Sequence, residues 1–519
     1  MEYISDETIS EIKILIGETY PKIKIQKSVF ECTVTGCPAD GVAVANFIAT
    51  DTNSIKSGHK NVLITPKIPS TVLGRLNDVV GIVTIHEDPS SHLSIVCRST
   101  GVPVLLVKEE DLHKLKNING AGNIALDGLS KRITVGDIVV DASTVLASKR
   151  KLLEKISSSF NLEIAANADT APDIADAVKQ GFRRFWPRSE TMLYEGDTLK
   201  YFNALLLEPS NKEIAEKFSE RHRKSIQALF FAADGGRVGF RLLDPPSHEF
   251  LPDPDNKEEV NELAVILNTS SEDIQARIRM AREQNPMIGH RGARLLLTHE
   301  TILECQISSS LDAWIDMEEK QRPKSLDILV PFIMHPKELQ IVRQKVLALV
   351  NRDKKYKGIP VKIGTMVEIP SILFYPEEIA KNADFISYGT NDLVALTHGI
   401  SRGDSYDRYL TSYIDRGIFD RDPFLILPQG VVENISTFSR RAKQVNPQIT
   451  ADLCGEHAVT TDVIPLLENN ALDSVSIGKE NLACFAQNLI AYWADAKSEF
   501  KRPLQKNLRE IKASSLEMK

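Results

Sequence analysis

Hydrophobic residues follow two different rhythms in the two parts of the chain. From about residue 29 to 142, short apolar runs are separated by Gly, Asp and other turn residues, which is typical of short strands. The runs are FECTVTG, GVAVANFIA, NVLITP, GIVTIH, VPVLLV, NIALDG and RITVGDIVVD. We therefore expect a small β-rich α/β domain over 29–142. Residues 1–28 before it begin with a helical pattern and continue as a lysine-rich connector.

From residue 160 onward, apolar runs alternate with long amphipathic helical patterns. The expected strands are LEIAANA (162–168), GFRRFW (181–186), RVGFRLLD (237–244), PMIGH (286–290), LDILVPFI (326–333), VKIGTMVEI (361–369), FISYGTND (385–392) and ITADLCGE (449–456). Eight strands separated by helices predict a (β/α)₈ TIM barrel over 159–519. The stretch 143–158 then reads as a linking helix. The fold class is thus α/β, with a small domain followed by a barrel.

Composition narrows the class of protein. A length of 519 residues predicts two or three domains. The net charge of −7 argues against a general binder of nucleic acid or anionic membranes. No apolar run is long enough to span a membrane, and the N-terminus lacks the order of a signal peptide. Six cysteines without repeated C-x-x-C spacing indicate reduced thiols and no zinc site. We expect a soluble cytoplasmic protein.

A single histidine stands out in the small domain, within DPSSHLSIVCR (88–98). Pro89-Ser90-Ser91 is a helix-start signature, which places His92 in a first turn. Unpaired backbone N–H groups there favour an anion, so a phosphorylated imidazole suits the position. Taken alone, however, the stretch favours an ordinary, half-exposed polar residue.

Polar residues also gather at the ends of the expected barrel strands. Because such barrels carry their chemistry at the C-terminal strand ends, these residues are the candidate site. They are Arg188 (PRSE), Arg241 (FRLLDPP), Arg291 (GHRG, after the expected fourth strand), Glu368 (GTMVEIP), Gly389, Thr390, Asn391 and Asp392 (YGTND), Arg402 (SRGD) and Cys454 (LCGEH).

The residue types in this set indicate a particular chemistry. Several arginines at one mouth imply a small polyanion held through carboxylate or phosphate. Glu368 and Asp392 suggest Mg²⁺ that also binds substrate oxygens, and Cys454 could move a proton at carbon. Each residue also has an ordinary explanation: an arginine as a surface ion pair, Asp392 as a helix cap, Cys454 as a buried hydrophobe. Their occurrence at successive strand ends favours the site.

The motifs resemble those of the phosphoenolpyruvate (PEP)-utilising enzymes, a family that includes pyruvate phosphate dikinase, PEP synthase and enzyme I of the sugar phosphotransferase system. GIVTIHEDPSSHLSIVCRSTGVPVLLV (81–107) is similar to the family's swivelling phosphohistidine domain. The barrel segments are most similar to the dikinases and are RLLDPPSHEFLP, NPMIGHRGARL, KIGTMVEIP, SYGTNDLVALTHGISRGD and ADLCGEHA. The resemblance covers about residues 30–500.

The resemblance implies a role for each candidate residue. His92 would be the phosphorylated histidine, and Cys454 would protonate the enolate carbon to give pyruvate. Glu368 and Asp392 would ligate Mg²⁺. The residues that bind PEP would be Arg188, Arg241, Arg291, Gly389, Thr390, Asn391 and Asp392, with Arg402 assisting. The family also suggests a homodimer formed through the barrel, and a small domain that swings on the 143–158 linker.

Two departures from the family concern the second phosphoryl partner. Dikinases carry a large N-terminal ATP-grasp domain, whereas about 28 residues precede the small domain here. Glu87 and Asp88 also stand near His92, where the family usually has glycines. We therefore expect a separate nucleotide-binding or acceptor protein, as in a split dikinase or PEP synthase. Two alternatives stay open, a dedicated PEP-dependent kinase of a small metabolite and a regulatory phospho-relay protein resembling enzyme I.

Overall fold

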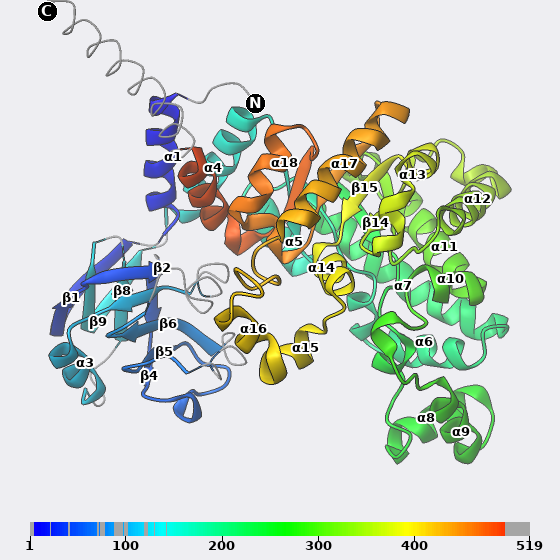
Figure 1. The fold of residues 1–519 in the computed structure, drawn as a ribbon. Coiled ribbons are helices and arrows are strands. Elements are labelled where there is room, and N and C mark those ends of the chain that lie inside the picture. Colours follow the sequence, from blue (N-terminus) through cyan, green and yellow to red (C-terminus); the bar gives the residue numbers. More distant parts are fainter. Residues whose placement is uncertain are drawn as a thin grey trace, which may run out of the picture.

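A computed structural model describes residues 5–493 except 21, 40–41, 70–71, 73–77, 88–96, 98–101, 119–122, 129 and 142. The predicted phosphohistidine, His92, lies outside the described residues, as do Asp88 and the two serines before His92. Figure 1 shows a small β-rich domain, in blue and cyan, beside a larger α/β body. Within the described part of the chain, no helix is both long and apolar enough to cross a bilayer.

The small domain is built from two sheets. An antiparallel sheet has the order β1-β9-β8-β3, and a mixed sheet has the order β2-β7-β6-β5-β4. Apolar residues of both sheets and of helix α3 share one buried cluster. The elements are β1 (Lys22–Thr33), β2 (Gly36–Ala39), β3 (Val42–Ala45), β4 (Phe47–Ala49), β5 (Asn61–Ile64), β6 (Val79–Thr84), β7 (Val104–Leu106), α3 (Glu109–Lys116), β8 (Asn123–Asp127) and β9 (Arg132–Asp141).

Strand β1 begins earlier than the sequence pattern predicted. Residues 22–28 were expected to be a connector, but Lys22 already pairs with Asp141 at the far end of β9. The physical reason is the alternation Lys22-Ile23-Lys24-Ile25, which has the period of a strand. The two strands that enter and leave the small domain therefore run side by side.

The larger body confirms the expected (β/α)₈ barrel. Eight strands close in chain order, and each pair of neighbours is parallel. The strands are β10 (Glu163–Asn167), β11 (Arg184–Phe185), β12 (Arg237–Arg241), β13 (Leu326–Val330), β14 (Val361–Val367), β15 (Phe385–Tyr388), β16 (Thr450–Leu453) and β17 (Ser474–Gly478).

One predicted strand was wrong, and one strand of the barrel was not predicted. PMIGH contains a short 3₁₀ helix, Pro286–Ile288, in the long excursion between β12 and β13. Pro286 lacks an N–H, and Gly289 follows closely, so this run is too short and too interrupted for a ladder. The fourth strand is β13, and the eighth is β17, whose sequence SVSIG was missed. Because PMIGH is not a strand, Glu368, Asp392 and Cys454 follow the fifth, sixth and seventh strands of the barrel. They were expected at the sixth, seventh and eighth.

Helices cover the barrel. They are α5 (Ala171–Lys179), α6 (Thr198–Leu207), α7 (Lys212–Ala233), α8 (Lys257–Leu267), α9 (Ser271–Ala281), α10 (Ala293–Thr298), α11 (Glu300–Asp316), α12 (Pro336–Arg352), α13 (Pro376–Asn382), α14 (Thr390–His398), α15 (Arg402–Ser405), α16 (Thr411–Asp415), α17 (Gln429–Val445) and α18 (Ile464–Glu468). Figure 1 shows α8 and α9 projecting as a hairpin away from the barrel.

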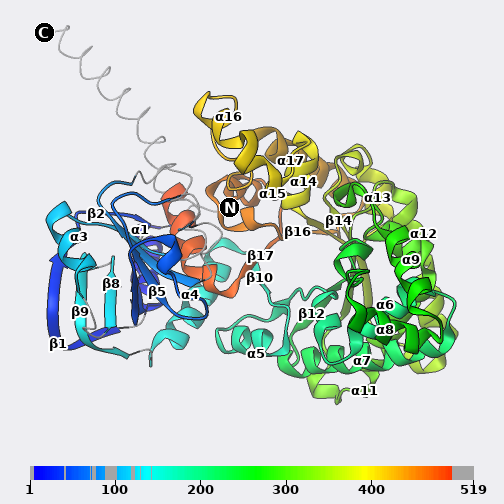
Figure 2. The ribbon, with the colours of Figure 1, turned by 90° about the horizontal axis from the view of Figure 1, so that it is seen from below.

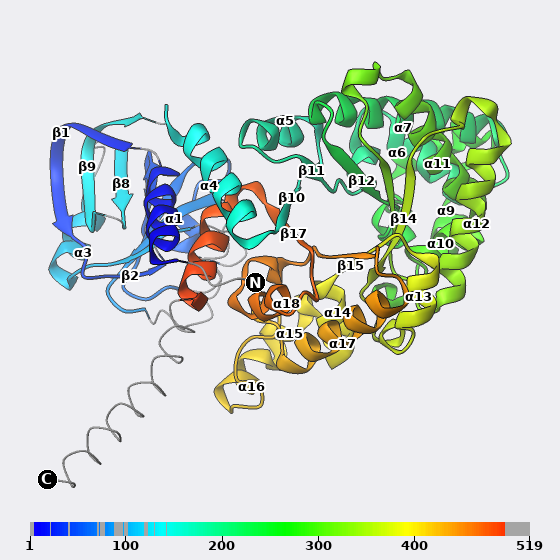
Figure 3. The same ribbon diagram turned by 90° about the horizontal axis from the view of Figure 1, so that it is seen from above.

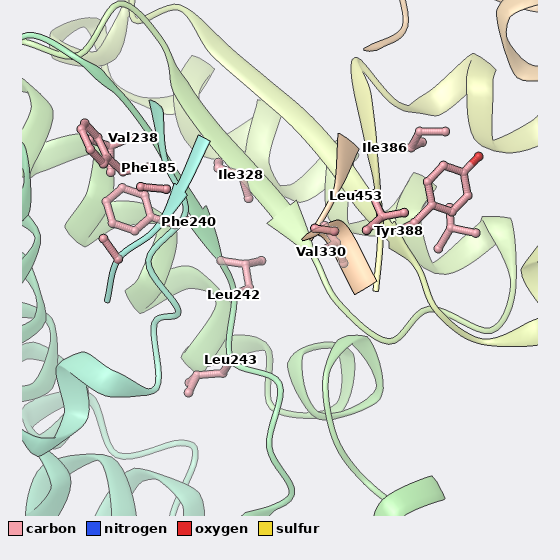
Figure 4. Packing of buried hydrophobic residues seen from close by; sticks show 14 of the residues in the cluster. Phe185, Val238, Phe240, Leu242, Leu243, Ile328, Val330, Ile386, Tyr388 and Leu453 are labelled. Carbon is pink, nitrogen blue, oxygen red and sulfur yellow. The ribbon is translucent and has the colours of Figure 1, made fainter. Parts of the chain in front are cut away.

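Strand residues alternate between the helix-facing side and the barrel interior, which decides which side chains can reach the site. Phe240 of β12 packs against Phe230 of α7, with ring centroids 5.5 Å apart. Figure 4 shows Phe240 beside Phe185 and Val238, and Tyr388 and Leu453 on the strands across the barrel. The residues at the alternate positions of these strands point into the barrel. There, Ala165, Trp186, Leu329, Met366 and Phe385 form a separate apolar cluster in contact with Cys454.

Helices α1 (Asp6–Glu18) and α4 (Val145–Phe160) pack together at the junction of the two domains, as Figures 2 and 3 show from opposite sides. The buried residues Ile9, Ile12 and Ile16 of α1 belong to the same core cluster as Leu152, Leu153 and Ile156 of α4 and the barrel residues. Lys155 and Glu11 add an ion pair. Both helices are therefore part of the barrel body.

Candidate active site

The C-terminal ends of the barrel strands surround a cavity of about 310 Å³. Its lining comes from all eight strands, β10 to β17, and from the loops that follow them. Of the residues predicted from the strand ends, those that line it are Arg188, Arg241, Glu368, Gly389, Asn391, Asp392 and Cys454. Parallel strands in a closed barrel all end on one face, which brings together residues far apart in the sequence.

Arg188 lies just beyond β11 and is held by a carboxylate from the neighbouring strand end. Its Nε donates to both oxygens of Asp169 at 3.1 Å, and its Nη2 donates to Oδ2 at 2.5 Å. These hydrogen bonds raise the pKa of Arg188 further, so it stays charged. The guanidinium is half-exposed at the cavity wall, with its orientation set before any ligand arrives.

Arg241, the last residue of β12, is more deeply buried than Arg188, with 17% of its side chain exposed. Its Nη2 contacts Glu190 Oε1, and its Nη1 lies 3.4 Å from Asp244 Oδ2. Burial alone would lower the pKa of Arg241, but the carboxylates of Glu190, Asp244 and Glu368 outweigh it and raise the pKa. Burial raises the pKa of Glu190 in turn.

Arg291 differs from its predicted position. It follows the 3₁₀ helix and no strand, and it is not among the residues that line the cavity. Its Nη2 donates to Asp244 Oδ2 at 2.7 Å, and its Nη1 lies 3.4 Å from Asp392 Oδ1. Its guanidinium stacks 4.1 Å from the Phe332 ring centroid. Arg291 therefore supports two carboxylates of the site from behind.

Glu368 and Asp392 both line the cavity, and burial disfavours the charged form of each carboxyl group. Burial raises the pKa of Glu368 well above its ordinary value, and the charges of Asp244 and Asp392 add to this. Burial also raises the pKa of Asp392, against the opposing effect of Arg291. One Glu368 oxygen accepts from the Phe332 N–H at 2.6 Å.

These two carboxylates fit a divalent cation that completes its shell with substrate oxygens. Five carboxylates (Asp169, Glu190, Asp244, Glu368, Asp392) surround three guanidiniums here, so negative charge is in excess when all are ionised. Among the described residues, no group of three or more acidic, His or Cys side chains is arranged as a complete metal site. Mg²⁺ commonly takes one or two carboxylates and several oxygens from water or phosphate.

The loop after β15 is shaped by close packing. A Cβ at Gly389 would lie 2.3 Å from Glu368 Oε2, so only glycine leaves that carboxylate its place. Thr390 is fully buried, and its Oγ1 lies 2.9 Å from Nδ1 of the buried His457, whose Nε2 contacts the Pro423 carbonyl. Asn391 accepts from the Glu456 N–H at 3.1 Å. Gly389 and Asn391 line the cavity, whereas Thr390 supports it.

Cys454 follows β16 and faces the cavity wall. Its thiol can donate to the Tyr388 carbonyl oxygen, with 3.6 Å between the two atoms. Burial raises the pKa of Cys454 to about 12, and the charge of Asp452 contributes to this rise. The thiol is therefore protonated at neutral pH, which suits a proton donor.

Arg402 begins α15, and its side chain lies outside the part of the chain that the structure describes. Sequence reasoning missed Asp169, Glu190 and Asp244, the partners of the three arginines. A signal was present, because Glu190 follows Arg188 by two residues and Asp244 follows Arg241 by three, at the same strand ends.

Two family models match this chain. The family model described as "PEP-utilising enzyme, mobile domain" matches residues 58–131, and that described as "PEP-utilising enzyme, PEP-binding domain" matches residues 144–491. Similar curated proteins are the pyruvate, phosphate dikinases of Clostridium symbiosum, 29% identical over 460 residues, and Rickettsia conorii, 30% over 456. Pyruvate, phosphate dikinase 2 of Zea mays is 30% identical over 463 residues.

Each of these three alignments covers 85% of this chain and 52% of the relative. The chain thus spans about half the length of the curated relatives it matches. The likeness covers both the small domain and the barrel whose mouth holds the cavity. Since the PEP-binding-domain match alone extends over more than half of its residues, this chain belongs to the family of PEP-utilising enzymes.

Proposed function

We propose that this protein moves a phosphoryl group between PEP and His92, with release or consumption of pyruvate. The observation that carries the proposal is a single cavity lined by Arg188, Arg241, Glu368, Asp392 and Cys454. PEP is a small anion with a carboxylate, a phosphate and a carbon that must gain a proton. The cavity offers two cations for the anionic groups and a thiol for the carbon.

The arginines would bind and orient PEP. Arg188 and Arg241 reach the cavity with guanidiniums already oriented by Asp169, Glu190 and Asp244. Each can bind a phosphate or carboxylate through two N–H groups. Arg291 would act from behind, by holding Asp244 and Asp392. Phosphoryl transfer depends mainly on such positioning and on charge stabilisation.

Glu368 and Asp392 would hold Mg²⁺ at the cavity. When bound, this ion would neutralise charge on the phosphate and on the enolate oxygen left after transfer. The two carboxylates favour this role because each is buried beside other negative charges, which a cation relieves. Gly389 makes room for Glu368, and Asn391 lines the same wall.

Cys454 would complete the reaction at carbon. Loss of the phosphoryl group leaves the enolate of pyruvate, whose C3 needs a proton. The Cys454 thiol lines the cavity and is protonated at neutral pH, so it can supply that proton. In the reverse direction the thiolate would remove a proton from the pyruvate methyl group.

The phosphoryl group on His92 would then pass to or from an acceptor bound by a separate polypeptide, such as a nucleotide-binding subunit. Two sequence features support this version. The chain contains no G-x-x-x-x-G-K-[ST] and no strand-linked G-x-G-x-x-G loop. Glu87 and Asp88, close to His92, favour a basic partner surface. A homodimer through the barrel remains a prediction from the family.

The experiment is labelling with ³²P-PEP and Mg²⁺. We expect acid-labile label on the wild-type protein with release of pyruvate, no label on His92→Ala, and normal label on His86→Ala, an exposed histidine six residues earlier. Wild-type protein that takes up no label and releases no pyruvate would overturn the proposal. Incubation of labelled protein with AMP and phosphate, without any partner, tests the acceptor. Transfer of the label to AMP or to phosphate would contradict the need for a separate subunit.

A further inference from the structure

The barrel interior holds another carboxylate, Asp452, directly beneath Cys454. The proposed function does not use it. Asp452 is two residues before Cys454, so both side chains point to the barrel interior. It is 2% exposed and accepts three serine hydroxyls: Ser474 at 2.7 Å, Ser476 at 2.9 Å and Ser387 at 3.2 Å. An isolated buried charge is costly, and the three hydroxyl donors compensate for the burial of this carboxylate.

Ser387 links this carboxylate to the cysteine. Its hydroxyl donates to Asp452 Oδ2 at 3.2 Å, and its proximity to the Cys454 thiol lowers the pKa of that thiol against the larger effect of burial. A serine has one O–H proton, so it can donate a hydrogen bond to the carboxylate or to a thiolate, but not to both at once. Ser387 is therefore a donor that can turn between Asp452 and Cys454.

The remaining surroundings of Asp452 keep the arrangement in place. Ser474, which donates to the other carboxylate oxygen, accepts from Arg184 Nη1 at 3.0 Å. Arg184 in turn donates to Glu163 at 2.7 Å. This cation sits one side chain away from Asp452, on the side remote from Cys454. Ser476 lines the cavity and donates to the same oxygen as Ser387.

The charged groups that face Cys454 come from three strands. Asp452 lies on its own strand, Glu368 follows β14, and Arg241 ends β12. The two carboxylates disfavour a thiolate, and Arg241 favours it. Glu368 and Arg241 lie at the cavity, where substrate and a cation would change their effect. Asp452 lies in the closed interior, so its influence persists through the reaction.

We propose that Asp452 is a positioning residue that, together with Ser387, keeps the proton on Cys454 until an enolate is present to accept it. This inference rests on the proposed function, because the enolate arises from PEP. Without a ligand, the hydroxyl of Ser387 points to Asp452 and the sulfur keeps its proton. When the enolate forms, the hydroxyl turns to the developing thiolate.

The step balances as follows in atoms and charge. The S–H bond of Cys454 breaks and a C–H bond forms at C3 of the enolate. The electron pair of the S–H bond stays on sulfur, and the enolate becomes neutral at that position as pyruvate forms. The thiolate regains a proton from solvent water after pyruvate leaves. Asp452 takes no proton in this step, and its carboxylate favours the protonated form of Cys454, the form that donates to carbon.

Two substitutions with opposite expected effects test the inference. Asp452→Asn removes the negative charge and should lower the pKa of Cys454, whereas Ser387→Ala removes a donor to the thiolate and should raise it. The measurement is the pH dependence of Cys454 alkylation by iodoacetamide, followed by mass spectrometry of the Cys454 peptide. Below its pKa, we expect Cys454 to react about tenfold faster in Asp452→Asn, which is the ratio for one pKa unit. Ser387→Ala should react more slowly than wild type.

Ser474→Ala is the matched control, because Ser474 donates to Asp452 without a described contact to Cys454. Its alkylation profile should stay close to that of wild type. Thermal unfolding shows which variants are folded, and Ser387→Ala keeps the test open should Asp452→Asn fail to fold. A merely structural role of Asp452 would change the unfolding temperature and leave the pH profile in place. An Asp452→Asn profile that coincides with wild type would overturn the inference.

Exchange of pyruvate methyl protons in D₂O, followed by NMR, separates this inference from the proposed function. We expect wild-type protein with Mg²⁺ to catalyse exchange, and Asp452→Asn to do so at lower pH, because thiolate is the form that removes the proton. Wild-type protein without exchange or label would refute the proposed function. Exchange in wild type with the same pH profile in Asp452→Asn would refute the role of Asp452 alone.

Discussion

At the scale of single residues, the site depends on pairs of opposite charge. Arg188, Arg241 and Arg291 each have a carboxylate partner, and these pairs lie at or just behind the cavity wall. The pairs of Arg241 and Arg291 are costly to break, because removal of one charge leaves the other largely buried without compensation. They explain how guanidiniums can be held in place in the absence of an anionic ligand.

Arg241 provides the sharpest test of this view. Arg241→Lys keeps the charge but loses the planar fork that serves Glu190 and Asp244 on one side and the ligand on the other. We expect the rate of ³²P labelling from PEP to fall by about tenfold or more, since loss of one hydrogen bond to a charged group costs about 1.5–3 kcal/mol. The assay is the initial rate at fixed PEP.

Arg237→Lys is the control, because Arg237 begins the same strand and pairs with Glu163 and Asp327 at the other end of the barrel. It should label at nearly the wild-type rate. A normal rate in Arg241→Lys would contradict the role given to this arginine.

At the scale of elements, the position of α4 changes the expected site of domain motion. The stretch 143–158 was expected to be a mobile linker, but α4 buries Leu152, Leu153 and Ile156 in the cluster that also contains α1 and the barrel. The small domain is joined to this body at two points, before Lys22 and after Asp141, and these residues pair with each other. We expect rotation at these two adjacent connections, with α1 and α4 remaining on the barrel.

Packing of α1 can be measured directly. Ile12 is 1% exposed within the shared core, whereas Ile14 on the same helix is 63% exposed. Ile12→Ala should lower the free energy of unfolding of the barrel by about 2–5 kcal/mol, the usual cost of a buried Ile-to-Ala change. Ile14→Ala should change it by less than about 0.5 kcal/mol. Urea unfolding of both variants gives the comparison, and equal effects would show that α1 does not belong to the barrel core.

At the scale of the whole molecule, the proposed function would divide the reaction between the two domains. The cavity residues all come from the barrel, and the predicted phosphohistidine belongs to the small domain. Chemistry at carbon should therefore be separable from phosphoryl transfer. In the proposed function, the small domain would link the two by moving to the barrel mouth.

This division predicts opposite phenotypes for two substitutions. His92→Ala should abolish labelling and retain exchange of pyruvate methyl protons in D₂O, because the barrel is unchanged. Cys454→Ala should lose nearly all exchange, about a hundredfold or more, because a positioned acid or base contributes about 10²–10⁴-fold. NMR of the methyl signal and ³²P labelling are measured on the same preparations. Loss of exchange in His92→Ala would show that the two sites are not independent.

Local patterns in the sequence were sufficient for the architecture and for much of the cavity. A (β/α)₈ barrel follows from the alternation of apolar runs and amphipathic helices, and in such a barrel all strands end on one face. Residues at strand ends, such as Glu368, Asp392 and Cys454, therefore converge whatever the details of packing. The same logic failed at PMIGH, where Pro and Gly interrupt the ladder, and at SVSIG, which is too short to stand out.

Only the tertiary structure decided the partners of those residues. Arg291 reaches Asp244 across 47 residues and Asp392 across 101, and Ser387 reaches Asp452 across 65. No local pattern specifies such contacts, because they depend on which side chains the closed barrel places against each other. The sequence by itself therefore determined the fold, the family and the strand ends that form the cavity. The folded barrel determined which carboxylate orients each arginine and which one lies beneath the cysteine.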